Sequence, residues 1–353
     1  MQERQFFASQ NFSWSKHLNS QSVLELRIDP STGRRVLIAE GRAARPNDFA
    51  VPSVQQSSGQ GPTSNCPFCR GNENQTPRAS AVLNDSSGNW QVRVVPNKFP
   101  AVSLNAPLPD NETAVINRFE SAVGTHEVII DNPEHIRDWT DMSLDNVSDV
   151  LRVYSERLSH CYEQLKLPAA VIFKNVGAQG GASLEHVHTQ LMSFPFVPEI
   201  LERELQVASD YFSRGEKCLF CQLIDDELRS RRRLVHENDS YVCFCAYAGR
   251  QPYECWILPK QHTSSFTDIK EIHALAETLQ SVLRRLCRIA SPPAYNLVLH
   301  TAPAGDPRSE AFHWHWELIP RITSLAGLEM GGGVFINSVS PERAARALLD
   351  INI

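Results

Sequence analysis

A repeated arrangement of cysteines and histidines constrains the fold of this chain more than any other feature of its sequence. Each half has a Cys-x-x-Cys pair followed by two widely spaced histidines: Cys66, Cys69, His135 and His186, then Cys218, Cys221, His262 and His313. The two histidines are 51 residues apart in both halves. A strand-like run precedes the first histidine of each half, and a helix-like stretch lies between the two. The repeat predicts a duplicated unit in which remote segments meet at two points.

Strand and helix patterns follow the same order in both halves. Strand-like runs occupy a hairpin at 22–41, then 90–97, 125–131 and 169–175, and later 240–247, 253–259, 295–300 and 313–320. Apolar residues recur at three- and four-residue steps in 143–166 and in 267–289, which predicts one long helix per half. We therefore expect an α+β fold with mixed or antiparallel sheets and flanking helices. The halves are expected at residues 1–200 and 201–353.

Two thiolates and two imidazoles form the ligand set of tetrahedral zinc. Four protein ligands leave no open coordination position, so each filled site would be structural rather than catalytic. We expect zinc in both sites, with iron an alternative for the second, where His315 competes with His313 as a ligand. A buried or redox thiol pair is the other interpretation, but it does not explain the matched histidines. The remaining five cysteines lie in apolar patterns and are predicted to be core residues: Cys161, Cys243, Cys245, Cys255 and Cys287.

Composition and charge exclude several partner classes. The chain is 42% hydrophobic and 21% charged, as in soluble globular proteins. A net charge of −6 provides no basic surface for nucleic acid. No apolar run approaches the length of a membrane span, and the first residues are polar. We therefore expect a cytoplasmic protein without membrane or nucleic-acid partners.

The segment "GGASLEHVHTQL" places His186, His188 and Gln190 at alternate positions after a glycine-rich turn. On a strand, these side chains would share one face. A polar sheet face is the simplest interpretation of His-x-His alone. If His186 binds metal, however, the neutral imidazole of His188 is free to attack the α-phosphorus of a nucleotide. Gly177, Gly180 and Gly181 allow close backbone approach, and N–H groups there could hold phosphate oxygens together with the hydroxyl of Ser183. Gln190 offers an amide donor to a non-bridging oxygen but no proton to a leaving group.

The chain resembles the galactose-1-phosphate uridylyltransferase family of the histidine-triad superfamily. The resemblance rests on "FKNVGAQGGASLEHVHTQ", "GRRVLIAEGRAARPNDF", "NCPFC" and "HWHWELIPR". The segments "LPKQH" and "GLEMGGGVFINSVSPE" are similar to the ADP-glucose phosphorylase-like branch. The resemblance implies a duplicated histidine-triad-like fold, mostly antiparallel, with the catalytic motif in the first half.

By position, the resemblance implies roles for individual residues. His188 matches the nucleotidylated histidine and Gln190 the phosphate-binding glutamine. Arg42, Arg45, Asn97, Asn175, Gly181 and Ser183 match residues that contact the nucleotide and its phosphates. The eight cysteines and histidines of the repeat match two metal sites. A homodimer with a shared site also agrees with the family.

Two departures limit the resemblance. Val187 and Thr189 replace the proline and glycine of the usual uridylyltransferase motif, so the base and the sugar stay open. Glu317 stands in the second half where Gln190 stands in the first, and its carboxylate would repel phosphate. We therefore expect one catalytic centre per chain.

We expect a nucleotidyltransferase that exchanges a nucleoside monophosphate between a UDP- or ADP-hexose and a sugar 1-phosphate or phosphate, through a covalent histidine adduct. The alternatives are a nucleotide hydrolase of the same superfamily, or a zinc-stapled nucleotide-binding protein without catalysis. A hydrolase usually carries a third histidine where Gln190 stands, to protonate a poor leaving group.

Overall fold

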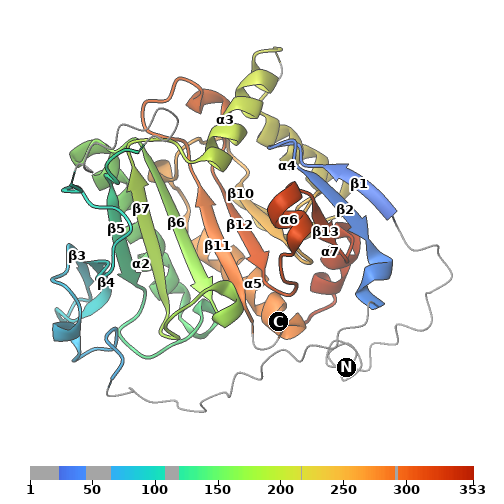
Figure 1. The fold of residues 1–353 in the computed structure, drawn as a ribbon. Coiled ribbons are helices and arrows are strands. Elements are labelled where there is room, and N and C mark those ends of the chain that lie inside the picture. The colour runs from blue at the N-terminus through green and yellow to red at the C-terminus, as the bar shows by residue number, and fades with distance from the viewer. Residues whose placement is uncertain (1–23, 45–64, 108–118, 216, 291–292) are drawn as a thin grey trace.

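The computed structural model describes residues 24–44, 65–107, 119–215, 217–290 and 293–353 (Figure 1). Its centre is one ten-stranded sheet in which every pair of neighbours is antiparallel. The first half supplies β3 (Ala81–Asn84), β4 (Trp90–Pro96), β5 (Thr125–Ile130), β6 (Ala169–Val176) and β7 (His188–Phe194). The second half supplies β8 (Leu234–Glu237), β9 (Tyr241–Cys245), β10 (Cys255–Pro259), β11 (Tyr295–His300) and β12 (His315–Pro320).

The strand order reveals the duplication directly. It runs β3-β4-β5-β7-β6-β11-β12-β10-β9-β8, and the two halves meet at the β6–β11 pair. Outward from that pair, each half arranges its five strands in the same order. The predicted α+β class and the mostly antiparallel, duplicated architecture are confirmed. The sequence predicted separate sheets, whereas hydrogen bonds between β6 and β11 join the halves into one continuous sheet.

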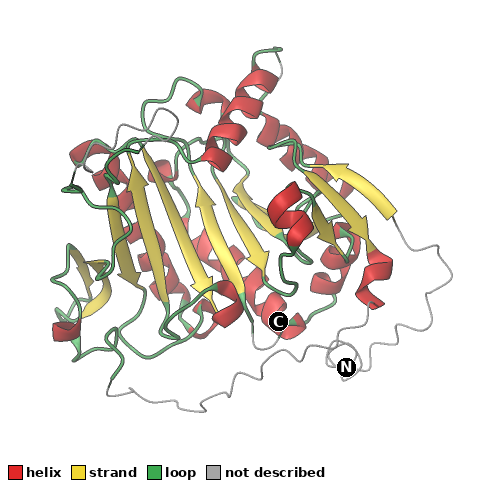
Figure 2. Ribbon diagram, in the orientation of Figure 1, coloured by secondary structure: helices red, strands yellow, loops and turns green. Residues whose placement is uncertain are grey.

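One long helix from each half covers the same face of this sheet (Figures 1 and 2). These are α2 (Leu144–Ser159) and α5 (Ile272–Ile289). The hydroxyl of Ser143 accepts from the N–H of Asn146 and caps the start of α2. The helix α5 begins later than predicted, because a left-handed residue, Glu271 at φ 50°, separates it from the short turn before it.

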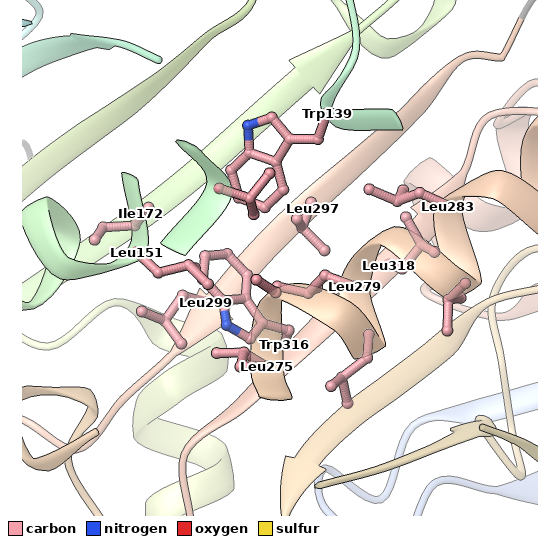
Figure 3. Packing of buried hydrophobic residues seen from close by; sticks show 14 of the residues in the cluster. Trp139, Leu151, Ile172, Leu275, Leu279, Leu283, Leu297, Leu299, Trp316 and Leu318 are labelled. Atoms are coloured by element: carbon pink, nitrogen blue, oxygen red, sulfur yellow. The ribbon is translucent and has the colours of Figure 1, made fainter. Parts of the chain in front are cut away.

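The core lies between these helices and the sheet (Figure 3). Each apolar residue predicted to face the core from the first helix is fully buried: Val147, Val150, Leu151, Tyr154, Leu158 and Cys161. Leu279 of α5, Leu297 of β11 and Trp316 of β12 pack in the same cluster. Because α2 and α5 share this core with strands of both halves, the halves fold against one another.

The opposite face of the sheet is covered unequally. The linker between the halves forms α3 (Glu199–Phe212) and α4 (Leu219–Ser230), whose apolar side chains pack on β9 and β10. Strands β9 and β10 are buried at every position, whereas β7 alternates between buried and half-buried residues. The first half therefore keeps an accessible sheet face, which continues in the second half along β11 but not along β9 and β10.

A smaller sheet contains β1 (Leu24–Ile28), β2 (Arg35–Ala39) and β13 (Phe335–Asn337). The strands β1 and β2 form the predicted hairpin, and β13 pairs with β2 in parallel. Two short helices flank β13 in the sequence, α6 (Gly327–Gly332) and α7 (Pro341–Leu349). Across the described part of the chain, none of the helices has both the length and the apolar character to cross a bilayer.

Candidate active site and metal centres

The four ligand candidates of the first half converge on one point. One ligand atom from each of Cys66, Cys69, His135 and His186 lies within 4.8 Å of all the others. The Nδ1 atom of His186 is 3.5 Å from both sulfurs, and Nδ1 of His135 is 3.4 Å from Sγ of Cys69. A tetrahedral ion with metal–sulfur distances of about 2.3 Å and metal–nitrogen distances of about 2.1 Å has sulfur–nitrogen edges of about 3.6 Å. The residues present therefore fit a tetrahedral metal ion.

The second half repeats this geometry. Cys218, Cys221, His262 and His313 offer ligand atoms within 4.8 Å of one another. Sγ of Cys221 lies 3.4 Å from Nδ1 of His262 and 3.5 Å from Nδ1 of His313. The structure thus brings His313, rather than His315, to this cysteine pair. A redox pair would need no histidines, and here two approach each pair.

Backbone carbonyls fix which nitrogen of the metal-facing histidines can coordinate. Nε2 of His186 lies 2.8 Å from the carbonyl oxygen of Asn132, and Nε2 of His313 lies 3.0 Å from that of Pro259. A carbonyl only accepts, so each Nε2 carries the hydrogen and each Nδ1 keeps its lone pair for the ion. Hydrogen bonds of this kind orient metal-ligating histidines.

His188 is the first residue of β7, directly after the metal-binding segment. Its side chain is 8% exposed, and the ring of Phe68, from inside the first cysteine pair, lies 5.2 Å away. Nδ1 of His188 lies 2.7 Å from the carbonyl oxygen of His186, so Nδ1 carries the hydrogen and Nε2 keeps its lone pair. Nε2 has no partner among the described residues and is not fully buried. Burial and the charge of Lys174 lower the pKa of His188, which favours the neutral ring.

A buried ion pair lies beneath the His188 strand and was missed by the sequence analysis. Nζ of Lys174 donates to Oδ2 of Asp131 at 2.7 Å and to the carbonyl oxygen of His188 at 2.9 Å. Trp139 and Thr189 donate to the same Oδ2 atom. Lys174 lies on β6 and Asp131 follows β5, so the network ties both neighbours of β7 to the candidate nucleophile. Only the unusual lysine inside an apolar strand could have signalled it.

Three amide side chains that the resemblance assigned to the substrate belong to the same part of the sheet as His188. Gln190 follows His188 on the same face of β7 and pairs with Phe173 of β6 and Val128 of β5. Asn175 is two residues after Phe173, so it shares this face. Asn97 follows β4, and its Nδ2 atom lies 3.0 Å from Nε2 of His126, which contacts Gln190.

The glycine turn uses part of its own hydrogen-bonding capacity. The N–H groups of Gly180, Gly181 and Ala182 bond carbonyls within the turn and are not free to hold phosphate. A Cβ atom on Gly180 would lie 2.8 Å from the carbonyl oxygen of Tyr295 on β11, so glycine here permits close packing. Gly181 adopts φ 84°, which glycine tolerates best. Ser183 is exposed, and its hydroxyl has no partner among the described residues.

Of the two predicted arginines, Arg42 is not brought to this site. Arg42 is exposed in the turn after β2, which lies beside β13 and is separated from β7 in Figure 1 by β6, β11 and β12. Arg45 lies outside the described residues.

His315, the counterpart of His188, is enclosed. It is fully buried, stacks on Trp256 at 5.0 Å, and lies 4.9 Å from Phe220 of α4. Its buried Nε2 finds no hydrogen-bond partner in the part of the chain that the structure describes, and it faces the α3 residue Glu204, 3.9 Å away. No room is left for a substrate at this ring, which agrees with one catalytic centre per chain.

A third group of possible metal ligands includes His315 and was not predicted. It consists of Glu204, His300, His315 and Glu317, with ligand atoms within 4.8 Å of one another. Arg250 donates to Glu317 at 2.5 Å and already supplies a positive charge there. The carboxylate that replaces glutamine in the second half therefore belongs to an internal charge network.

Comparison with known proteins agrees with this geometry. Residues 14–198 match the N-terminal domain of galactose-1-phosphate uridyl transferase, and residues 204–328 match its C-terminal domain. The chain belongs to the galactose-1-phosphate uridylyltransferase family, and it is an enzyme of the nucleotidyltransferase class.

Individual relatives cover nearly the whole chain. An ADP-glucose phosphorylase from Arabidopsis thaliana is 31% identical over 334 residues, covering 93% of both proteins. A galactose-1-phosphate uridylyltransferase from Thermotoga maritima is 25% identical over 341 residues, covering 94% of this chain and 99% of that protein. The crystal structure of an Arabidopsis thaliana ADP-glucose phosphorylase with bound ADP-glucose superposes with a TM-score of 0.80 at 30% identity, covering 94% of this chain and 100% of the other. A uridylyltransferase structure gives 0.71 at 28% identity, covering 92% and 97%.

Proposed function

We propose that this enzyme moves a nucleoside monophosphate from a nucleotide sugar to a phosphate acceptor through a covalent adduct on His188. The observation that carries the proposal is the orientation of that ring. The carbonyl of His186 holds its Nδ1 hydrogen, and its Nε2 lone pair is unpartnered at an accessible sheet face. A neutral imidazole so oriented is a nucleophile at neutral pH.

In the first step, the Nε2 lone pair forms a bond to the α-phosphorus. The bond from that phosphorus to the bridging oxygen breaks, and hexose 1-phosphate leaves with the electron pair. The imidazole gains positive charge, which the carbonyl dipole of His186 stabilises through the Nδ1 hydrogen. In the second step, an acceptor phosphate oxygen attacks the same phosphorus and the lone pair returns to Nε2. The protein supplies position and donors, and neither step needs a proton donor.

ADP-glucose and inorganic phosphate are the substrates to test first. The relative named ADP-glucose phosphorylase is more similar to this chain than the uridylyltransferases described above, in sequence and in structure. Val187 and Thr189 also depart from the usual uridylyltransferase motif. UDP-glucose with galactose 1-phosphate is the competing pair.

The same geometry gives less support to the two alternative functions, hydrolysis and binding without catalysis. A hydrolase with a poor leaving group needs an acid near His188, and Gln190 has no acidic hydrogen to give. A purely structural or binding protein does not need an oriented, unpartnered imidazole.

The test is to incubate the protein with ADP-glucose or UDP-glucose labelled at the α-phosphate, without an acceptor, and to measure an acid-labile adduct by intact mass. We expect one label per chain, released by inorganic phosphate or a sugar 1-phosphate. His188→Gly should abolish the adduct and keep the metal content. Free nucleotide without an adduct would mean a hydrolase, and neither product would mean a binding protein; both results contradict the proposal.

We further propose that the ions are zinc, one in each Cys-x-x-Cys site, held by Cys66, Cys69, His135 and His186 and by Cys218, Cys221, His262 and His313. Their role is structural, since all four coordination positions are filled by the protein. An ion held by Cys66 and Cys69 would also fix Phe68, which lies between them in the sequence, against the ring of His188. Elemental analysis of the purified protein tests the proposal, and iron in the second site would correct it.

Finally, we propose that the chain forms a homodimer. Leu24, Leu26 and Ile28 project from one face of the edge strand β1 and are 79%, 56% and 54% exposed, a pattern found at protein interfaces. Arg42 would then contribute to a nucleotide site of the second copy rather than its own. Sedimentation of the wild type and of a Leu26→Glu variant tests this, and a monomeric wild type would contradict it.

A further inference from the structure

Three amide side chains near His188 share one unusual property. In Gln190, Asn175 and Asn97 the oxygen already accepts a hydrogen bond from the protein. The NH2 groups of these three amides, called their amines below, donate to no acceptor among the described residues. The one close approach is that of Asn97 to Nε2 of His126. Three donors with no acceptor on one sheet face are suited to a ligand rich in oxygen atoms.

Backbone groups indicate which way each side-chain amide points. These directions therefore do not depend on which atom of the amide is taken as oxygen and which as nitrogen. The N–H of Ala101 lies 3.3 Å from Nδ1 of His126 and can only donate, so Nδ1 keeps its lone pair and Nε2 carries the hydrogen. That hydrogen requires an acceptor, and the oxygen of Gln190 is 2.9 Å away. The amine of Gln190 must then point the other way.

With this tautomer of His126, the side-chain amide nitrogen of Asn97 has no acceptor on the ring. Its oxygen accepts from the N–H of Phe99 at 2.9 Å, so its amine faces Nε2 of His126 at 3.0 Å. A hydrogen on Nε2 cannot accept from this amine. The other tautomer would satisfy Asn97 but would set two hydrogens against each other at Ala101. Each tautomer therefore leaves one donor facing another, Asn97 at 3.0 Å in the first and Ala101 at 3.3 Å in the second, and we assign the first because it satisfies both Ala101 and Gln190.

Asn296 orients the side-chain amide of Asn175 in the same way that His126 orients that of Gln190. Its amine donates to the carbonyl oxygen of Gly180 at 2.7 Å, which fixes the direction of its own amide. The same amine donates to the oxygen of Asn175 at 2.8 Å. Asn296 lies on β11, so the second half of the chain orients a side chain of the first.

We propose that His126 and Asn296 are positioning residues that hold the amines of Gln190 and Asn175 toward the phosphate oxygens of the substrate. The proposal rests on the proposed function and deepens it. An unheld amide can rotate and turn its oxygen toward the anion, where it repels instead of donating. Neither residue was singled out from the sequence.

The experiment compares His126→Leu with His126→Gln, whose amide can still donate to Gln190. His273→Leu, an exposed histidine on α5, is the matched control. The readout is the single-turnover rate of adduct formation from the two diastereomers of one nucleotide sugar. In each diastereomer, sulfur replaces a different non-bridging oxygen of the α-phosphate. The wild type should prefer one of them, because a single amide nitrogen of Gln190, held as proposed, donates to one of the two non-bridging oxygens and not to the other.

Loss of one oriented donor costs about 10²–10³-fold in rate. We expect His126→Leu to approach that loss and to reduce the sulfur preference to the level of Gln190→Ala. The double variant should react no more slowly than Gln190→Ala, and His126→Gln should recover part of the rate. Asn296→Ala should likewise slow the reaction without adding to Asn175→Ala.

Two results overturn the inference alone: an adduct whose rate and sulfur preference are unchanged in His126→Leu, or losses that multiply in the double variant. A wild type that forms no adduct from any nucleotide sugar would overturn the proposed function as well. Melting temperatures of all variants separate misfolding from misorientation, and the Gln variant keeps the test decisive if the Leu variant unfolds.

Discussion

Replacing Lys174 by methionine would remove a buried charge while keeping an unbranched side chain of similar length. Lys174 is 1% exposed and the side chain of Asp131 is fully buried. The Nζ–Oδ2 distance is 2.7 Å, and the same Nζ holds the carbonyl oxygen of His188 at 2.9 Å. After the substitution, the Asp131 carboxylate keeps the neutral donors Trp139 and Thr189 and loses its positively charged one.

Removing one partner of a buried ion pair costs about 3–5 kcal/mol, because the other charge stays buried without compensation. We expect Lys174→Met to lower the free energy of unfolding by an amount in that range. Asp131→Asn should also lower the free energy of unfolding, because it leaves the ammonium group of Lys174 buried without a negative partner. The double variant buries no charge, so its loss should be smaller than the sum of the two single losses.

The assay is denaturant unfolding at pH 7, followed by fluorescence and circular dichroism, with the metal content of each variant measured in parallel. Asp149→Asn, which removes the partner of Arg152 in an exposed pair, is the control. The reasoning is refuted if Lys174→Met costs no more than an exposed pair, about 1 kcal/mol or less, or if the two single losses simply add. Adduct formation should also slow, since the His188 carbonyl loses its donor.

Three further predictions concern metal, packing and pH. His186→Ala should remove about one equivalent of metal, and elemental analysis that finds the metal retained would contradict the assigned ligand set. Gly180→Ala should cost about 1–3 kcal/mol of unfolding free energy, because its Cβ would lie 2.8 Å from the carbonyl oxygen of Tyr295; an unchanged denaturation midpoint would show that the turn can shift. Although burial opposes it, hydrogen bonds from Arg27 and Arg233 lower the pKa of Glu342 from 4.5 to about 2. Its stabilisation is therefore present above pH 4.5 and lost as the pH falls toward 2, so the stability difference from Glu342→Gln should shrink over that window, and a constant difference would refute it.

The sequence predicted the elements of this fold and the convergence of eight ligands, because those features depend on local periodicity and on matched spacing. The apolar residues of α2 faced the core as the three- and four-residue steps required. The pairing of β6 with β11 could not be predicted, because the backbone N–H and C=O groups of either strand could bond to many other strands.

The contacts around His188 were predicted less completely, for a physical reason. His126, Lys174 and Asn296 act through partners on adjacent strands, and cross-strand neighbours depend on register rather than on spacing along the chain. The glycine turn was correctly located. Its N–H groups are used inside the turn, which only the backbone path reveals.

The seam between β6 and β11 has a consequence for how such a protein can be divided. Asn296 reaches across this seam to Asn175, so the half without the reactive imidazole completes the half that has it. Two fragments made by cutting the linker before α4 would each carry a whole metal-binding motif, yet neither would carry a whole substrate site. Activity would return only when the fragments are mixed and the seam closes again.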